Sequence, residues 1–338
     1  MFTIQHQYIE RDSGKICTER LYADTVVKFL YSNARENTQA LFRAVVSAWG
    51  SSLLGYINYE TILGAKMSWK KGHLQPVSIN LDECVDSPTS LNTVKKVFER
   101  KIRYWECRPM PDDTYAIVSP SDSRVILGSF CETSSLFLKN KFFDYEELLG
   151  RNKREWLSAF LQGNFAVFRL TPEKYHYNHT PVAGKVVDFY EIDGDYHACN
   201  PGAVVTMVTP YSKNKRVVTV IDTDVPGGSK AGLVVMIEIV ALMIGKIVQC
   251  YSEEKYDFPQ KVCRGIFLKK GFPKSLYRPG SSTTVLIFQK GRVRFAEDLI
   301  RNMSRQGVES RFSKGFGVPL VETDLRVRSF LAHAIDNK

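Results

Sequence analysis

The stretch R-P-G-S-S-T-T-V-L-I-F at residues 278–288 decides the fold and suggests a chemistry. Its second half is a run of β-branched and apolar residues, which predicts a buried strand. Directly before the strand, Pro279 fixes φ and Gly280 allows unusual backbone angles, so the peptide bonds here can be held under strain. The turn ends in Ser281 and Ser282, and a serine hydroxyl beside a strained bond can attack the preceding carbonyl. The alternative is an ordinary turn that leads into a strand.

From about residue 114 onward, short runs rich in Val, Ile, Phe and Tyr alternate with Gly, Pro, Asn and Asp, which is typical of β-strands. The expected strands are 114–118, 164–170, 184–190, 216–223, 283–288 and 292–295. The most apolar run, 232–248, contains Glu238 and Lys246. It has fewer than the about 18 uninterrupted apolar residues that a spanning helix requires. Its Val and Ile content favours buried strands with a turn near Gly245.

Helices are expected before this β-rich part. Apolar residues at helical spacing occupy much of 24–65, including A-L-F-R-A-V-V-S-A-W-G-S-S-L-L-G-Y at 40–56. This helix either packs on the core or lies in a membrane interface. Shorter helices are expected at 91–102 and, within the β-rich part, at 142–150 and 296–303. The predicted fold class is α+β.

The predicted organisation has two parts. Residues 1–90 form an N-terminal helical region that associates with membranes in the interfacial alternative, and residues 91–338 form a mostly β catalytic domain.

The net charge of +10 and a pI of about 9.1 suit an anionic partner such as an acidic membrane surface. Nucleic acid is not expected, because no basic block, zinc finger or RNP signature occurs. The seven widely spaced cysteines contain no C-x-x-C pair and indicate reduced thiols in the cytoplasm. The N-terminus is too polar for a signal peptide. A protein that is peripheral to the membrane is therefore expected.

Two further segments contain residues suited to proton transfer. In F-R-L-T-P-E-K-Y-H-Y-N-H-T-P-V-A-G-K-V, at 168–186, His176 and His179 lie three residues apart. On one helical turn their imidazoles would share a face. They could bind a metal, act as base and proton donor, or be ordinary core histidines. In A-I-V-S-P-S-D-S-R-V-I, at 116–126, Asp122 is expected in a turn between two apolar runs.

Taken in order along the chain, these segments resemble the phosphatidylserine decarboxylase family over roughly residues 90–320. V-F-E-R-K-I-R-Y-W-E-C-R-P-M at 97–110 looks like its aromatic-Arg and Arg-Pro lead-in, and S-P-S-D-S-R-V-I at 119–126 like its Pro-x-Asp segment. Y-H-Y-N-H-T-P-V-A-G at 175–184 is similar to its Tyr-His-x-x-His-x-Pro segment. The Gly-Ser-Ser segment, followed by K-G-R-V-R-F at 290–295, resembles its self-processing site.

The resemblance implies a role for each matching residue. Asp122 and His179 would form a protease-like triad with the processing serine, with His179 as base and Asp122 orienting it. The chain would cut itself after Gly280 or one residue later, and the new terminal serine would become a pyruvoyl group. His176 would handle protons during decarboxylation. The pyruvoyl group is the implied cofactor, and the resemblance implies no metal.

The modified serine is left open between two neighbours. Gly280 favours Ser281, because a glycine before the serine lowers the steric cost of strain. Counting back from Phe288 without a gap favours Ser282.

The resemblance implies conversion of phosphatidylserine to phosphatidylethanolamine at an anionic membrane surface, by a heterodimer of the chain's own fragments. Two alternatives remain: decarboxylation of a free amino acid, and an unprocessed lipid-binding protein.

Two other segments are second-rank candidates. D-V-P-G-G-S-K-A-G at 224–232 could cradle a phosphate with Gly227, Gly228 and Lys230, or could be a glycine turn between strands. His197 and Cys199 lie in a segment that would line the site by resemblance.

Overall fold

The computed structural model describes residues 5–21, 24, 30–31, 39–47, 50, 79–134, 136–138, 141–207, 209–242, 246–279 and 282–335. Its helices are α3 (Gln39–Val46), α6 (Val94–Phe98), α7 (Tyr104–Cys107), α8 (Tyr145–Leu149), α9 (Arg154–Ala159), α10 (Pro201–Thr206), α11 (Pro210–Lys213), α12 (Glu297–Met303) and α13 (Arg311–Phe316), with a 3-10 turn at Leu81–Glu83. Its first eight strands are β1 (Gln7–Glu10), β2 (Ile16–Thr18), β3 (Ala116–Val118), β4 (Ser123–Ser129), β5 (Asn164–Leu170), β6 (Tyr177–His179), β7 (Gly184–Ile192) and β8 (Arg216–Asp222). The others are β9 (Leu233–Val240), β10 (Ile247–Gln249), β11 (Phe267–Leu268), β12 (Pro273–Tyr277), β13 (Ser282–Phe288), β14 (Val293–Phe295), β15 (Glu322–Leu325) and β16 (Phe330–Ala334).

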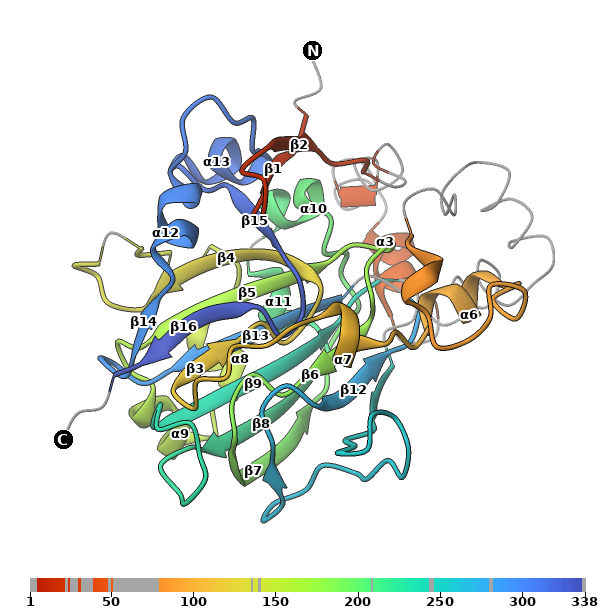
Figure 1. Cartoon of the computed structure of the whole chain (residues 1–338). Helices are drawn as coiled ribbons and strands as arrows, with labels where there is room; N and C mark the ends of the chain where they lie inside the picture. Colours follow the sequence, from red (N-terminus) through yellow and green to blue (C-terminus); the bar gives the residue numbers. More distant parts are fainter. Residues whose placement is uncertain are drawn as a thin grey trace.

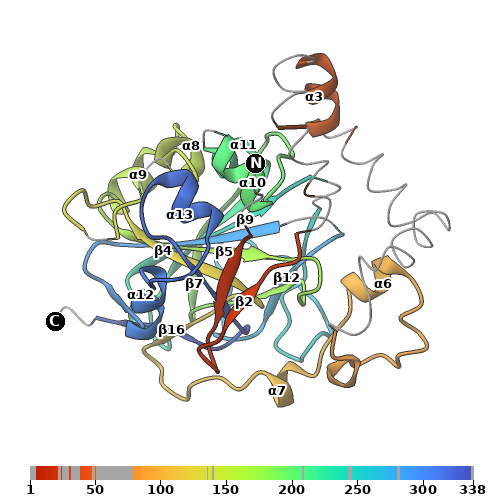
Figure 2. The same cartoon turned by 90° about the horizontal axis from the view of Figure 1, so that it is seen from above.

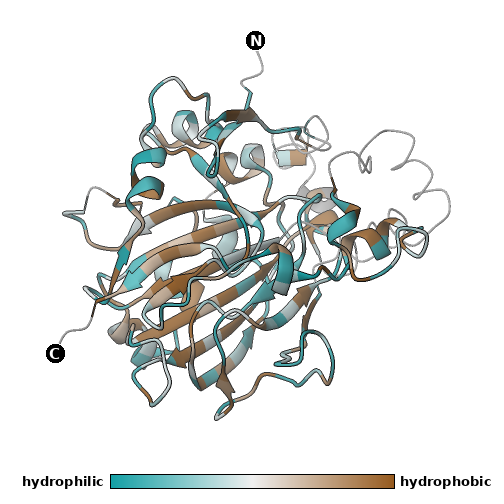
Figure 3. Ribbon diagram, viewed as in Figure 1, coloured by the Kyte–Doolittle hydropathy of each residue, from teal (hydrophilic) through white to brown (hydrophobic). Residues whose placement is uncertain are grey.

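A ten-stranded sheet forms the centre of the molecule, in the order β11-β7-β8-β9-β13-β5-β4-β15-β1-β2 (Figure 1). Neighbouring strands are antiparallel except β1 and β15, which are parallel. The middle strands are buried almost throughout, which explains their nearly continuous Val and Ile content. Figure 3 shows the apolar residues concentrated in these strands and the polar residues around them.

Two different layers cover the central sheet. Helices α8, α9, α10 and α11 lie along one face, and the other face carries two small sheets, β10-β12-β6 and β14-β16-β3 (Figures 1 and 2). Side chains of successive strand residues point to opposite faces. The middle strands of the main sheet, which are buried on both faces, therefore contribute alternately to a helical layer and to a β layer.

The structure confirms the α+β class and the strand predictions, including 232–248, which forms β9 and β10. The turn expected near Gly245 falls at 243–245, outside the described residues. The helix expected at 91–102 is shorter: only Val94–Phe98 is helical, because Ile102 bridges to Cys84 and its N–H donates to the Tyr256 hydroxyl. Among the described residues, no helix is long and apolar enough to cross a membrane.

The N-terminal region differs from the expected helical one. Residues 7–18 form β1 and β2, which extend the main sheet. Of the helix expected at 24–65, only α3 and a few single residues are described. In α3, Phe42 and Val46 are buried in a cluster with Tyr31, which favours packing on the core for these side chains. The division at residue 90 stays a prediction.

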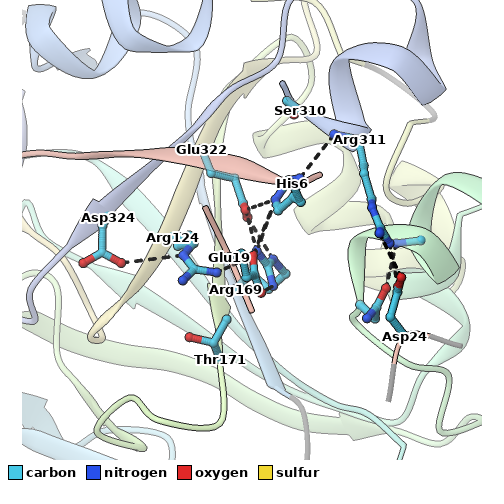
Figure 4. A network of polar contacts seen from close by, with 12 residues as sticks. His6, Glu19, Asp24, Arg124, Arg169, Thr171, Ser310, Arg311, Glu322 and Asp324 are labelled. Carbon is cyan, nitrogen blue, oxygen red and sulfur yellow. Dashed lines mark hydrogen bonds and ion pairs between the residues drawn. The ribbon is translucent and has the colours of Figure 1, made fainter. Parts of the chain in front are cut away.

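A buried ionic network joins the residues that flank β1 and β2 to strands β4, β5 and β15 (Figure 4). The Arg169 guanidinium lies 2.6 Å from the Glu19 carboxylate and 2.5 Å from that of Glu322, and His6 Nε2 lies 2.7 Å from Glu322. Arg124 forms a further ion pair with Glu19. His6, Glu19 and Glu322 are close enough to hold a metal ion, but the two guanidiniums already match the carboxylate charges.

Protonation of this network should destabilise the fold. Burial alone would raise the pKa of the Glu19 and Glu322 carboxyls, but the arginines hold both below their usual values. A carboxyl whose folded-state pKa is lowered contributes stability above its unfolded pKa. The network therefore stabilises the fold at neutral pH, and its contribution is lost as the pH falls.

Arg169→Met is expected to destabilise the protein by about 3–5 kcal/mol, because it leaves two buried carboxylates without their cation. Thermal and chemical unfolding measure the change. The matched control is Arg151→Met, which removes an exposed i,i+4 ion pair to Glu147 and should change stability by less than about 0.5 kcal/mol. Equal effects of the two substitutions would contradict this role for the network.

Candidate active site

The site is built around the beginning of β13, the strand at the centre of the sheet. Ser282 is its first residue and pairs with Leu170 of β5 and Val240 of β9. The Ser282 hydroxyl is buried and has no hydrogen-bond partner among the described residues. Gly280 and Ser281 lie outside the described residues.

The two residues that follow Ser282 are held from opposite faces of the sheet. On the helical face, the Thr283 hydroxyl donates to Cys199 Sγ at 3.1 Å. Burial raises the pKa of Cys199 to about 11, so the group is a thiol at neutral pH. On the other face, the Thr284 hydroxyl donates to Asn178 Oδ1 at 2.9 Å. Cys199, a second-rank candidate, therefore lies directly beside β13.

Tyr277 of β12 connects the start of β13 to His176. Its hydroxyl donates to the Thr283 carbonyl at 2.8 Å, and its N–H donates to the His176 carbonyl at 3.0 Å. Because both contacts involve backbone atoms, the histidine segment and β13 have a fixed spacing.

His176 is fully buried and has one free acceptor. Its Nδ1 lies 2.8 Å from the Lys174 carbonyl, which can only accept, so Nδ1 bears the hydrogen. Nε2 has no partner among the described residues. Burial, with a smaller effect of Arg100, lowers the pKa of His176 to about 3. The neutral imidazole therefore presents a nitrogen lone pair that accepts no hydrogen bond from the part of the chain that the structure describes.

His179, the last residue of β6, has both ring nitrogens occupied. Nδ1 donates to the Gly271 carbonyl at 2.9 Å, and Nε2 lies 3.0 Å from the Tyr175 hydroxyl. Burial also lowers the pKa of His179 to about 3. The two histidines do not share a helical turn, because this segment leads into a β-strand.

Asp122 lies in the turn before β4, as the sequence predicts. Its carboxylate accepts two hydrogen bonds from Arg108, at 3.0 and 2.8 Å, and one from the Val327 N–H at 2.7 Å. Burial would raise its pKa, but Arg108 lowers it, so the carboxylate is ionised. The turn adjoins His179 through the backbone, since the His179 N–H donates to the Pro120 carbonyl at 2.7 Å. No hydrogen bond between the described Asp122 and His179 side chains is present.

A buried ion pair on the same face of the sheet was missed by sequence reasoning. Lys274 and Glu238 are fully buried, and the Lys274 ammonium lies 2.6 Å from Glu238. Asn178 donates to Glu238 at 3.4 Å and to Ser275 at 3.2 Å. These contacts therefore orient the Asn178 amide, whose oxygen accepts the hydrogen bond from the Thr284 hydroxyl. The signal in the sequence was a single glutamate inside the apolar run 232–248.

Helix α6 covers His176. The Phe98 ring stacks on the imidazole with 3.5 Å between centroids and 27° between planes. The next residue, Glu99, accepts two hydrogen bonds of 3.0 Å from Arg278, which lies two residues before Gly280. One short helix thus contacts both the free histidine and the chain that enters the candidate cleavage site.

The remaining candidates have local structural contacts. Lys230 donates to the carbonyls of Asp224 and Val225, at 3.0 and 3.1 Å, so its ammonium closes the loop between β8 and β9. A Cβ on Gly228 would meet the Thr223 carbonyl oxygen at 2.2 Å, which explains the glycine as a turn residue. The contacts of Lys230 and Gly228 favour the glycine-turn alternative for residues 224–232. His197, the other second-rank candidate, stacks its imidazole on Phe42.

The sequence of the chain is similar to those of several known proteins. A family model described as phosphatidylserine decarboxylase matches residues 94–312, from α6 to the start of α13. A phosphatidylserine decarboxylase proenzyme of Fusobacterium nucleatum is 28% identical over 91% of this chain and 95% of its own length. One of Chlamydia trachomatis is 27% identical over the same shares. Proenzyme 2 of Oryza sativa is 32% identical over 73% of this chain but only 38% of its own length.

The stack of Phe98 on His176 generates a prediction. Phe98→Ala and the milder Phe98→Leu should admit water to the imidazole, so the pKa of His176 should rise from about 3 toward its ordinary value of 6.5. NMR titration of the imidazole signals measures this change. Phe137→Ala, which removes an exposed ring that does not stack on His176, is the control. An unchanged pKa in both Phe98 variants would show that the ring does not set this environment.

Proposed function

The chain belongs to the phosphatidylserine decarboxylase family, and from this premise we propose that it cuts itself at the start of β13 and decarboxylates phosphatidylserine with a pyruvoyl group made from its own serine. The observation that carries the proposal is a neutral His176 whose Nε2 has no partner among the described residues and which is fixed through Tyr277 to the first residues of β13. The reaction class is that of a carboxy-lyase.

The described residues fit a pyruvoyl group at this position. Ser282 and His176 each present a buried polar atom that lacks a partner among the described residues. The surrounding charges are paired, Glu238 with Lys274 and Asp122 with Arg108, so the site offers no free buried charge of its own among these groups. The group supplies an electrophilic carbonyl that draws the electrons released when CO2 leaves.

Self-cleavage would begin with attack of the Ser281 or Ser282 hydroxyl on the carbonyl before it. A base must take the hydroxyl proton, and His179 is neutral and therefore able to accept one. The ionised Asp122 carboxylate favours the charged form of His179. The Asp122 carboxylate accepts its own hydrogen bonds from Arg108 and from the Val327 N–H. Asp122 therefore assists His179 through its charge and not through a hydrogen bond.

His176 is suited to the second reaction. With a pKa of about 3 it is a proton acceptor at neutral pH, so it takes up a proton before it can return one to the carbon that has lost CO2. Phe98 excludes water from one face of the ring, and the Lys174 carbonyl fixes the tautomer.

The position of β13 supports a heterodimer of the two fragments. After a cut before Ser282, the C-terminal fragment would still pair with β5 and β9 of the other fragment, over seven residue pairs on each side. A strand buried between two partners cannot leave without exposing its apolar residues and unpaired backbone groups. The pieces should therefore stay together after cleavage.

Phosphatidylserine at a membrane surface is the proposed substrate. It offers an amine to bind and a carboxylate to lose, and an anionic surface attracts a protein with a net charge of +10. The proposed location is the cytoplasm, peripheral to the membrane. A free amino acid offers the same two groups without the surface, which makes it the alternative to test.

The serine variants test self-cleavage. Full-length protein should split into two fragments, the smaller with about one sixth of the 338 residues. Ser281→Ala should abolish the split and Ser282→Ala should only slow it, while Ser304→Ala, at an exposed serine, should have no effect. Gel analysis of fresh protein measures the extent. The opposite pattern for the first two variants would move the modified residue to Ser282.

His179→Ala should slow cleavage by several powers of ten if it is the base, since loss of such a group is typically that costly. His176→Ala should permit cleavage but impair decarboxylation. The two reactions are followed separately, by gel and by CO2 release. Cleavage of His179→Ala at the wild-type rate would show that the base is another group.

The substrate is decided by measuring CO2 release from phosphatidylserine vesicles beside that from free serine and tryptophan. We expect release from the lipid, with sedimentation on anionic vesicles that weakens at high salt because exposed charges are screened. Turnover of only the soluble amino acids, without vesicle binding, would overturn the lipid assignment.

A further inference from the structure

A continuous chain of hydrogen bonds runs through His179. At one end, Nδ1 donates to the Gly271 carbonyl. At the other, Nε2 lies 3.0 Å from the Tyr175 hydroxyl, which lies 2.8 Å from the Tyr256 hydroxyl. The Tyr256 oxygen lies 2.8 Å from the Ile102 carbonyl and accepts the Ile102 N–H at 3.1 Å. The chain thus ends on a backbone acceptor and a backbone donor of the same residue.

The hydrogens of this chain can be counted for neutral His179. Since a carbonyl only accepts, the single ring hydrogen lies on Nδ1. Nε2 then accepts from Tyr175, and the Tyr175 oxygen accepts from Tyr256. The Ile102 carbonyl remains satisfied, because the Tyr104 N–H donates to it at 2.8 Å. With neutral His179, every group in this series of hydrogen bonds therefore has a partner.

When His179 is charged, every group in this series of hydrogen bonds again has a partner. Nε2 now has a hydrogen and donates to the Tyr175 oxygen, Tyr175 donates to the Tyr256 oxygen, and Tyr256 donates to the Ile102 carbonyl. Each hydroxyl hydrogen has turned around, but no heavy atom has moved. Two tyrosine hydroxyls therefore satisfy either protonation state of a buried imidazole, for which an unpaired polar group would be costly.

The same contacts restrict how a proton reaches the ring. Nδ1 is occupied by Gly271 and Nε2 by Tyr175, and Tyr175 and His179 are both fully buried. Unless a contact breaks, a proton arrives at Nε2 through the Tyr175 oxygen.

We propose that Tyr175 relays protons to and from His179, and that Tyr256 positions this relay by accepting the Tyr175 hydrogen when His179 is charged. In the transfer, the arriving proton forms a new O–H bond on Tyr175 while the original Tyr175 O–H bond breaks and an N–H bond forms at Nε2. The proton comes from the hydroxyl of the attacking serine, whose oxygen keeps the electron pair with which it attacks the carbonyl. The proposal rests on the proposed role of His179 as the base of self-cleavage.

Tyr256 allows a selective test, because its hydroxyl matters mainly for one state. In Tyr256→Phe, neutral His179 keeps its donor Tyr175, whereas charged His179 leaves the Tyr175 hydrogen without its acceptor. Self-cleavage should therefore slow by about 10- to 100-fold, the value of a hydrogen bond that supports a charge. Tyr175→Phe, which removes the relay itself, should slow it at least as much.

The matched control is Tyr104→Phe. The Tyr104 ring lies edge-on to His179 with 4.7 Å between centroids, and its hydroxyl makes no hydrogen bond to any described residue. Cleavage of freshly translated full-length chain is followed in H2O and in D2O. We expect a larger solvent isotope effect for the wild type and Tyr104→Phe than for Tyr175→Phe, because the relay transfers two hydrogens through Tyr175 and the variant cannot transfer the second.

The outcomes separate this proposal from the proposed function. If the wild type splits and Tyr256→Phe splits at the Tyr104→Phe rate, the relay is wrong while self-cleavage stands. A slower Tyr175→Phe with an unchanged isotope effect also overturns the relay, since a packing defect slows cleavage equally in H2O and in D2O. A wild-type chain that never splits overturns the proposed function, and the relay with it.

Discussion

The pairing of β13 with strands on both of its edges is the constraint on which the rest of the structure depends. Seven residue pairs join it to β5 and seven to β9, and its side chains are buried on both faces. The first residues of the strand therefore have fixed positions relative to His176, directly before β6, and to Tyr277 at the end of β12. A cut at this point can change the chemistry of the new chain end without changing the fold around it.

Burial determines the chemistry of the groups near this strand. Both His176 and His179 are fully buried, and burial holds each neutral at physiological pH. The buried carboxylates near the strand are paired with cationic side chains, Asp122 with Arg108 and Glu238 with Lys274. Paired charges orient their neighbours, while the neutral imidazoles remain able to accept protons. This division follows from the high cost of a buried charge without a partner.

Much of the fold could be predicted from local sequence, because β-branched runs between turn residues mark β5, β7, β8, β9 and β13 with little ambiguity. Strands β1 and β2 could not, since a short polar segment such as Gln7–Glu10 becomes a strand only by pairing with β15 far along the chain. The same limit applies to the site. The His segment and the Gly-Ser-Ser turn were found as motifs, but the partners of each side chain depend on tertiary contacts: Asp122 binds Arg108, and His179 binds a tyrosine that itself contacts Tyr256.

Intact mass spectrometry of the purified full-length protein tests the central claim most directly, because it detects cleavage, the cut position and the new chain end together. The account predicts two polypeptides whose boundary lies before Ser281 or Ser282, and a smaller one that has a pyruvoyl group in place of a terminal serine and therefore lacks its α-amine. A single mass for the uncut chain, in protein that releases CO2 from phosphatidylserine, would contradict it.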